Sequence, residues 1–186
     1  MFEEKDLIDI INGVRNGNKN YQRRLYDQLS PILYPICLRY LSPTEEAEEA
    51  LMDSFLKIYQ KIDELKEAKA LITWSKKICI NCCLDALKKK KIIFEPIDDN
   101  FTLNKNSTND FFSNLSAKDV LKLIQLLPSG YRTVLNLYAI EGYQHAEIAK
   151  ILGIEEGTSK SQLARARVCL QKLIDKHLNI ENVTQQ

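Results

Sequence analysis

The sequence predicts an all-α protein of two small helical domains joined by a flexible linker. The 186-residue chain has only six Gly and five Pro, and its apolar fraction of 45% is sufficient for a packed core. Apolar residues recur at helical spacing in both halves, and no segment has a convincing strand pattern. Between the halves, residues 92–114 are rich in Asn and Asp and lack a sustained apolar period, which is typical of a linker.

The N-terminal domain is expected over residues 1–91. Its first helix is predicted by an apolar stripe with the spacing i, i+3, i+4, i+7, which consists of Leu7, Ile10, Ile11 and Val14. A second helix follows, and we expect Ser30-Pro31 to restart it, because proline at a first helical position sacrifices no hydrogen bond.

Two further helices complete this domain. Ser42-Pro43-Thr44 opens the third helix, whose first turns carry glutamates that favour the positive end of the helix dipole. Its buried stripe is predicted to contain Leu51, Phe55, Ile58 and Ile62. A loop over residues 64–70 leads into the fourth helix, expected from about Leu71 to Lys90.

Five cysteines, an odd number, favour a reducing cytosol over a disulfide scaffold. Helical spacing places Cys79, Cys82 and Cys83 on one face, where cysteine behaves as a small hydrophobe. This run also resembles half of a metal site, but the second pair that a zinc site needs is missing. We therefore expect a buried structural role, with metal or redox chemistry as the alternative.

The C-terminal domain is expected over residues 115–186. Ser116 and Asp119 have the spacing of a capping box. Further along, a short helical pattern over Gln144 to Leu152, a turn at Gly153 and a longer helix around Thr158 to Leu173 predict a helix-turn-helix, in which glycine takes the left-handed conformation of the turn. The inward face of the last helix is predicted to contain Leu163, Ala166, Leu170 and Leu173.

Helical geometry leaves a polar face of the last helix for DNA. Lys160, Ser161, Ala164 and Arg165 point outward, with Gln162 and Arg167 at the margins. Arg and Gln can read base edges, whereas Lys and Ser mainly bind phosphates. A solvated helix with scattered charges is the alternative.

Composition narrows the function class. The net charge of +1 does not itself indicate nucleic-acid binding, so this prediction depends on local clusters such as Lys88–Lys91. No apolar run approaches the roughly 18–20 residues of a membrane span, and the acidic start Met1–Asp6 is unlike a secretory signal. No phosphate-binding loop, nucleophile elbow or His-based metal motif is present, so we expect no enzyme and no cofactor, metal or small-molecule substrate. The cysteine usage and the lack of a membrane span or secretory signal predict a cytoplasmic protein.

Two sets of motifs resemble one family, the extracytoplasmic-function sigma factors of the sigma-70 family. The run from Leu127 to Arg167 resembles their domain four through Glu147-Ile148-Ala149, Leu152-Gly153-Ile154, Gly157-Thr158 and Leu163-Ala164-Arg165. The N-terminal half resembles domain two through residues 47–55, Thr73-Trp74 and Asn81 to Asp85 with the lysine run. The resemblance covers essentially the whole chain, in the family's order.

The resemblance implies a protein that binds core RNA polymerase and directs it to promoter DNA. Domain two would dock on the clamp coiled coil of the β′ subunit, and domain four would touch the β flap. The residues matching the polymerase contact are Glu45, Glu49, Met52, Asp53 and Lys57. An anti-sigma factor is a further partner that the resemblance implies.

The resemblance also assigns the two promoter elements. The minus-thirty-five element would be read by the outward face of the last helix. The minus-ten element would be opened by the loop at residues 63–70 and by Trp74, Lys76, Lys77, Asn81, Lys88, Lys89, Lys90 and Lys91. Strand opening needs a pocket for an extruded base and a cationic groove. For Trp74, the alternative to a DNA contact is core packing. For the lysines, the alternative is that they form a solvated helix end.

Two other classes of protein remain as alternatives. A helix-turn-helix regulator could act without binding core polymerase, but residues 1–91 lack the α/β receiver pattern of the response-regulator kind. A helical adaptor that binds only proteins would not explain the Lys, Ser and Arg on the outward face of the last helix. DNA binding without polymerase binding would favour the regulator, and the absence of DNA binding would favour the adaptor.

Overall fold

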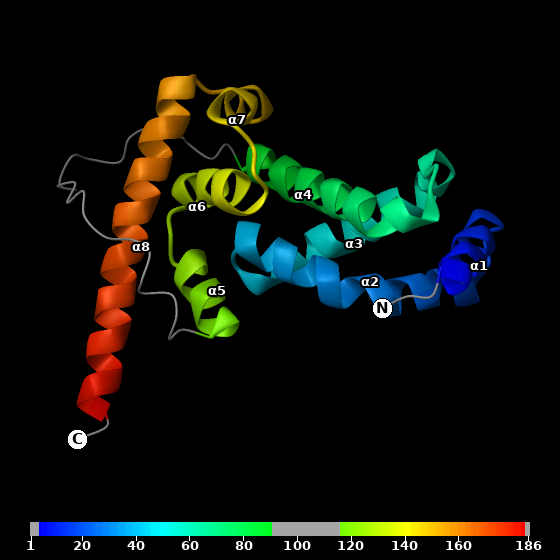
Figure 1. Ribbon diagram of the computed structural model, residues 1–186, viewed down its shortest axis with the longest axis horizontal. Helices are drawn as coiled ribbons and strands as arrows, with labels where there is room; N and C mark the ends of the chain where they lie inside the picture. The colour runs from blue at the N-terminus through cyan, green and yellow to red at the C-terminus, as the bar shows by residue number, and fades with distance from the viewer. Residues whose placement is uncertain (1–3, 91–115, 185–186) are drawn as a thin grey trace. The chain divides into compact units, whose positions relative to one another are not determined.

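The computed structural model describes residues 4–90 and 116–184, and the chain divides into two compact units, Met1–Lys90 and Lys91–Gln186. Every regular element of the described residues is helical, so the predicted all-α class is confirmed (Figure 1). The predicted linker, residues 92–114, lies outside the described residues, and the domain bounds 1–91 and 115–186 stay a prediction.

The first unit is a small helical bundle. Its elements are α1 (Glu4–Arg15), α2 (Lys19–Tyr40), α3 (Thr44–Gln60), η1 (Ile62–Glu64), η2 (Ala68–Ala70) and α4 (Leu71–Lys89). Helices α2, α3 and α4 all pack on one another, and α1 packs on α2 (Figure 1). The predicted apolar stripes of the first and third helices are buried, each residue being at most 8% exposed.

The expected restart at Ser30-Pro31 is wrong, because α2 is one helix of 22 residues with Pro31 and Pro35 inside it. A proline in a helix interior removes a hydrogen bond and costs about 3 kcal/mol. Both prolines are exposed, so water can hydrate the carbonyls that they leave unpaired. The opposite face buries Leu29, Leu33 and Cys37, and this packing offsets the cost of the prolines.

Gly13 of α1 lies against the ring of Tyr21. A Cβ added at Gly13 would lie 2.1 Å from Tyr21 Cγ. Although alanine has the higher helix propensity, we expect Gly13→Ala to lower the free energy of unfolding by about 1–3 kcal/mol through overpacking. Urea unfolding measures this, with Gly157→Ala as the control, because a Cβ there meets nothing within 4 Å. An equal loss in both variants would contradict the packing argument.

The second unit is built around its last helix. Its elements are α5 (Ala117–Gln125), α6 (Ser129–Leu135), the π-helical η4 (Asn136–Ile140), α7 (His145–Leu152) and α8 (Glu156–Thr184). Helices α5, α6 and α7 each pack against α8. The predicted cap is confirmed, because the Asp119 backbone N–H donates to the side chain of Ser116. The core of the second unit contains the fully buried Val134, Leu137 and Ile148.

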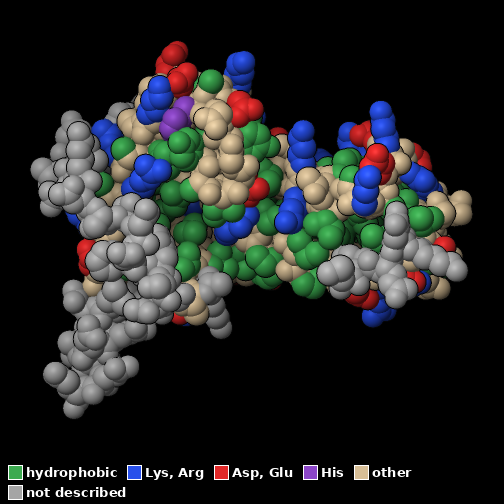
Figure 2. Space-filling model, in the orientation of Figure 1, with side chains coloured by type: hydrophobic (Ala, Val, Ile, Leu, Met, Phe, Trp, Pro, Cys, Tyr) green, Lys and Arg blue, Asp and Glu red, His purple; other side chains and the backbone are tan. Residues whose placement is uncertain are grey.

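The surface of the described residues carries charges of both signs. Figure 2 shows Lys and Arg side chains interspersed with Asp and Glu on the visible face. Among the described helices, none has the length and apolar character needed to cross a bilayer.

Candidate nucleic-acid interface and acidic groove

The predicted helix-turn-helix is formed by α7 and the start of α8. Gln144 and Glu147 form a capping box, in which the Gln144 backbone N–H donates to Glu147 Oε2 at 2.8 Å. Gly153 ends α7 with φ 68°, a conformation that glycine adopts without steric cost. Ile148 and Leu163 are buried where α7 and α8 pack together. This packing holds the start of α8 in place.

Most of the predicted DNA-contacting residues of α8 are accessible. Lys160 and Arg167 are exposed, while Ser161, Ala164 and Arg165 are half-buried. Lys160 Nζ lies 2.6 Å from Glu156 Oε1, and the hydrogen bond from Lys160 lowers the pKa of Glu156. A phosphate that binds Lys160 would therefore compete with this carboxylate.

Gln162 does not lie at the margin of this face as the sequence analysis expected. It is only 2% exposed and lies with Ser159, Leu163 and Ala166 on the buried side of α8. These positions share a side because residues three and four apart are neighbours on a helix. A base contact by Gln162 would require its side chain to leave the core, so its position gives that prediction no support.

An aromatic and polar cluster that was not predicted from the sequence lies beside this face. His145 Nδ1 lies 2.9 Å from Ser159 Oγ, and the imidazole stacks on Tyr138 with ring centroids 4.5 Å apart. The Arg167 guanidinium lies 5.9 Å from the centre of the Tyr138 ring. Burial, followed by the charge of Lys160, lowers the pKa of His145, which favours its neutral form. The cluster connects η4, α7 and α8, and no spacing in the sequence indicates it.

In the first unit, α4 carries most of the residues predicted for the minus-ten element. At 100° per residue, Trp74, Lys77, Asn81 and Lys88 lie within about 60° of one another around the helix. Lys77, Asn81 and Lys88 are exposed, and Trp74 is half-buried. Lys76 is also exposed but points about 100° away from Lys77. The half-buried Trp74 has both a packed side and an accessible side.

The lysine run closes α4, and Lys88 is its member on this stripe. Lys88, Lys89 and Lys90 are exposed, and Lys91 lies outside the described residues. Lys90 pairs with Glu46 at the start of α3. Lys88 and Lys89 take part in no ion pair found among the described residues. Among the described lysines of the run, these two are therefore the best placed to meet phosphates.

A groove between α2 and α3, called here the acidic groove, brings together four of the five residues predicted to bind core polymerase. These four are Glu45, Glu49, Met52 and Asp53. The rest of the lining consists of Tyr26, Ser30, Pro31, Tyr34, Glu48 and Leu51. Met52 is 46% exposed, so the groove combines carboxylates with an accessible apolar side chain.

Lys57, the fifth of these residues, lies outside the acidic groove. Its Nζ lies 3.1 Å from Asp85 Oδ2 of α4, and this hydrogen bond is the main reason that the pKa of Lys57 is raised. Lys57 thus connects α3 to the helix that carries Asn81.

The α2 side of the acidic groove was not predicted from the sequence. Tyr34 Oη lies 3.4 Å from Glu48 Oε1, and burial, followed by the charge of Glu48, raises the pKa of this tyrosine. Tyr34 and Pro31 could not be assigned from the sequence because they lie on a different helix from the acidic residues. The periodicity of one helix does not show which side chains of another helix complete a groove.

In comparisons with known proteins, two separate stretches of the chain match two different family models. Residues 25–92 match the family model of sigma-70 region 2, and residues 117–170 match that of sigma-70 region 4. Two helical units with these matches and a helix-turn-helix define a transcription initiation factor of the sigma-70 type.

Similarity to individual proteins narrows the family assignment further. It is 28% identical over 178 residues to the ECF RNA polymerase sigma factor SigW of Bacillus subtilis, covering 87% of this chain and 93% of the relative. It is 30% identical over 132 residues to the ECF RNA polymerase sigma factor SigM of Mycobacterium tuberculosis, covering 70% of this chain and 65% of the relative. The chain belongs to the extracytoplasmic-function group of the sigma-70 family.

A solved complex of the sigma factor RpoE with the anti-sigma factor NepR from Bartonella quintana is also similar. The matching chain of that complex is 22% identical to this one. The alignment covers 82% of this chain and 96% of the matching chain, with a TM-score of 0.49.

Proposed function

We propose that this protein binds core RNA polymerase and directs it to promoters with a minus-ten and a minus-thirty-five element. The observation that carries the proposal is the acidic groove. It gathers four residues that the family resemblance assigns to polymerase binding, within a chain that also has a helix-turn-helix. A regulator that acts on DNA alone would have no need for such a groove.

The groove suits a basic partner helix with apolar side chains. Glu45, Glu49 and Asp53 are exposed, and exposed charges of one sign steer an oppositely charged partner. The accessible Met52 offers a flexible apolar contact at the same place. The family resemblance identifies this partner as the clamp coiled coil of β′, with the β flap as a contact of the second unit.

The stripe on α4 is proposed to engage the opened minus-ten strand. Asn81 offers both a donor and an acceptor to a base edge, and Lys77 and Lys88 stand near it on the same stripe to attract phosphates. The half-buried Trp74 is proposed mainly to support this surface by packing. The loop at residues 63–70 is proposed to take part in strand opening.

The minus-thirty-five element is proposed to bind the start of α8. Arg165 would read a base edge, because its planar fork of donors matches guanine. Lys160, Ser161 and Arg167 would contact phosphates and fix the register, and Ala164 would allow close approach. Gln162 is left out of this set because it is buried.

Removing charge from the lysine run should change the salt dependence of promoter binding. Each phosphate contact contributes about 0.7–0.9 to the slope of log K against log salt concentration. We expect Lys88→Gln with Lys89→Gln to make the slope for the holoenzyme–promoter complex shallower by about 1.5. Titrations at several salt concentrations measure this, with Lys19→Gln and Arg23→Gln on α2 as the matched control. An unchanged slope would indicate that the lysine run is only a solvated helix end.

An anti-sigma factor is proposed as a second partner of the acidic groove. A protein that covers this surface would compete directly with polymerase, which makes the groove an efficient place for inhibition. A cytoplasmic location, where polymerase and DNA are found, is part of the same proposal.

Co-elution of the purified chain with core polymerase tests the proposal. The expected result is a stoichiometric complex on size-exclusion chromatography. DNA binding without a polymerase complex would instead support a helix-turn-helix regulator that acts alone, and loss of both would support an adaptor.

A further inference from the structure

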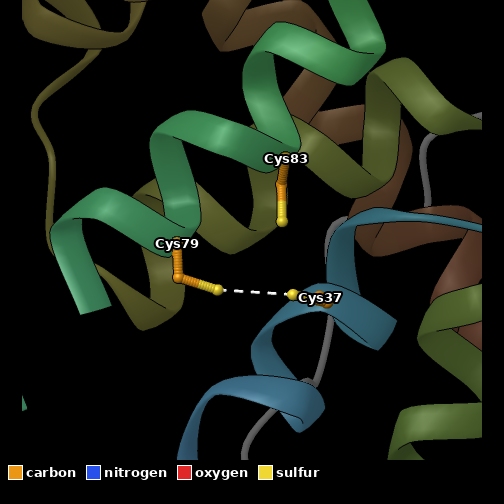
Figure 3. A group of neighbouring side chains, drawn as sticks. All are labelled: Cys37, Cys79 and Cys83. Carbon is orange, nitrogen blue, oxygen red and sulfur yellow. Dashed lines mark hydrogen bonds between the residues drawn. The ribbon is translucent and has the colours of Figure 1, made fainter. Parts of the chain in front are cut away.

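Three cysteines that are separated in the sequence meet in the core of the first unit. Cys37 comes from α2, and Cys79 and Cys83 come from successive turns of α4 (Figure 3). All three are fully buried, and their sulfur atoms lie within 4.8 Å of one another. The Sγ atoms of Cys37 and Cys79 are 3.3 Å apart. The expected structural burial is confirmed, but no sequence pattern indicated that Cys37 joins the group.

The spacing of the three sulfurs suits a single bound ion. Bonds of about 2.3 Å, the length of zinc–sulfur bonds, would hold sulfur atoms about 3.8 Å apart at tetrahedral angles. This separation lies between the 3.3 Å of the Cys37–Cys79 pair and the 4.8 Å limit of the group. Small side-chain rotations would therefore bring all three sulfurs to one centre.

The ligand set and its surroundings select the kind of ion. Thiolates favour soft ions. Structural zinc takes four ligands, and no fourth His, Cys, Asp or Glu joins the group among the described residues. Copper(I) with three thiolates would leave two net negative charges in an apolar core, which is costly. A trivalent ion with three thiolates is neutral and avoids that cost.

We propose that Cys37, Cys79 and Cys83 form a binding site for a trivalent thiophilic ion of the arsenic and antimony class. With arsenite, three As–O bonds break and three As–S bonds form. Each thiol proton leaves on a released hydroxide as water, and no electrons are transferred. Arsenite is small and uncharged at neutral pH, so it can enter when α4 opens locally from α2.

Binding would connect α2 to α4, the helix that carries Asn81. An ion that binds the folded state raises its stability by mass action. Arsenite is therefore expected to raise the thermal midpoint of the first unit in the reduced protein and not that of the second unit.

The test uses the full chain, reduced with a phosphine and incubated with arsenite. Native mass spectrometry is expected to show one arsenic per chain. Brief alkylation in denaturant, which exposes all five thiols, followed by peptide mapping should then find Cys37, Cys79 and Cys83 protected only when arsenite is present, and Cys82 and Cys169 modified with or without it. Protection of Cys82 with Cys83 instead, or no bound arsenic, would overturn the site. Because this mapping uses the unaltered protein, it does not depend on how well any variant folds.

Matched variants separate the cluster from a general affinity of thiols. Cys82→Ala removes a neighbouring cysteine that is 4% exposed and lies outside the three-sulfur group, so it should keep arsenite binding. Cys37→Ala should lower the affinity at least tenfold. Equal affinities in the two variants would refute the role of α2. Copper(I) held by the three cysteines, with no arsenite bound, would contradict the proposed class of ion.

Discussion

Reversing two charges in the acidic groove, by Glu49→Lys with Asp53→Lys, is expected to weaken binding to core RNA polymerase on the order of 100-fold, or about 2.8 kcal/mol. Both carboxylates are exposed on α3 and line the groove proposed to receive a basic helix. The change removes two attractions and adds two like-charge repulsions. Titration of fluorescently labelled variant protein with core polymerase measures the dissociation constant.

The matched control places the same charge reversal outside the groove. Asp6→Lys with Asp9→Lys changes two exposed carboxylates of α1, which contributes nothing to the lining of the groove. Its polymerase affinity should stay within a few-fold of the unaltered protein at physiological salt. A similar loss in both variants would mean that net charge, rather than the groove, determines the affinity.

Arg165→Ala is expected to reduce transcription from the cognate promoter about 10- to 100-fold while core polymerase binding is unchanged. A well-placed bidentate contact between arginine and guanine contributes about 1–3 kcal/mol of discrimination. Arg165 lies at the start of α8, in the unit that carries the helix-turn-helix, and the groove belongs to the other unit. Run-off transcription and polymerase titration on the same protein preparation measure the two effects separately.

Lys176→Ala is the control for lost positive charge on the same helix. Lys176 is exposed and lies about three turns beyond Arg165, so promoter output should be unchanged. If Arg165→Ala abolished polymerase binding instead, the assignment of this face to DNA would be wrong.

The fold was predictable from local patterns because each helix buries a stripe with helical period. The stripes of α1 and α3, the cap at Ser116 and the turn at Gly153 all lie where the sequence places them. The length of α2 was not predictable. Proline argues locally for a break, and only tertiary packing of Leu33 and its neighbours outweighs it.

The sites were predictable where one helix supplies the residues and not where several helices meet. The carboxylates of α3 follow from one motif, but Tyr34 across the groove belongs to α2. The burial of Gln162 depends on how α8 packs against the rest of its unit, which a helical projection of one segment cannot decide. For the same reason, the contact of His145 with Ser159 and that of Cys37 with Cys79 could not be predicted from the sequence.

Reconstituted run-off transcription is the most direct test that this chain directs polymerase to promoters. The purified chain is combined with core RNA polymerase on fragments of the genome that encodes it, and the start sites are mapped. The prediction is that transcripts begin at defined positions only when the chain is present, and that they are lost with the Glu49→Lys, Asp53→Lys protein. Polymerase that starts at the same positions without the chain, or a chain that binds DNA but never joins polymerase, would contradict it.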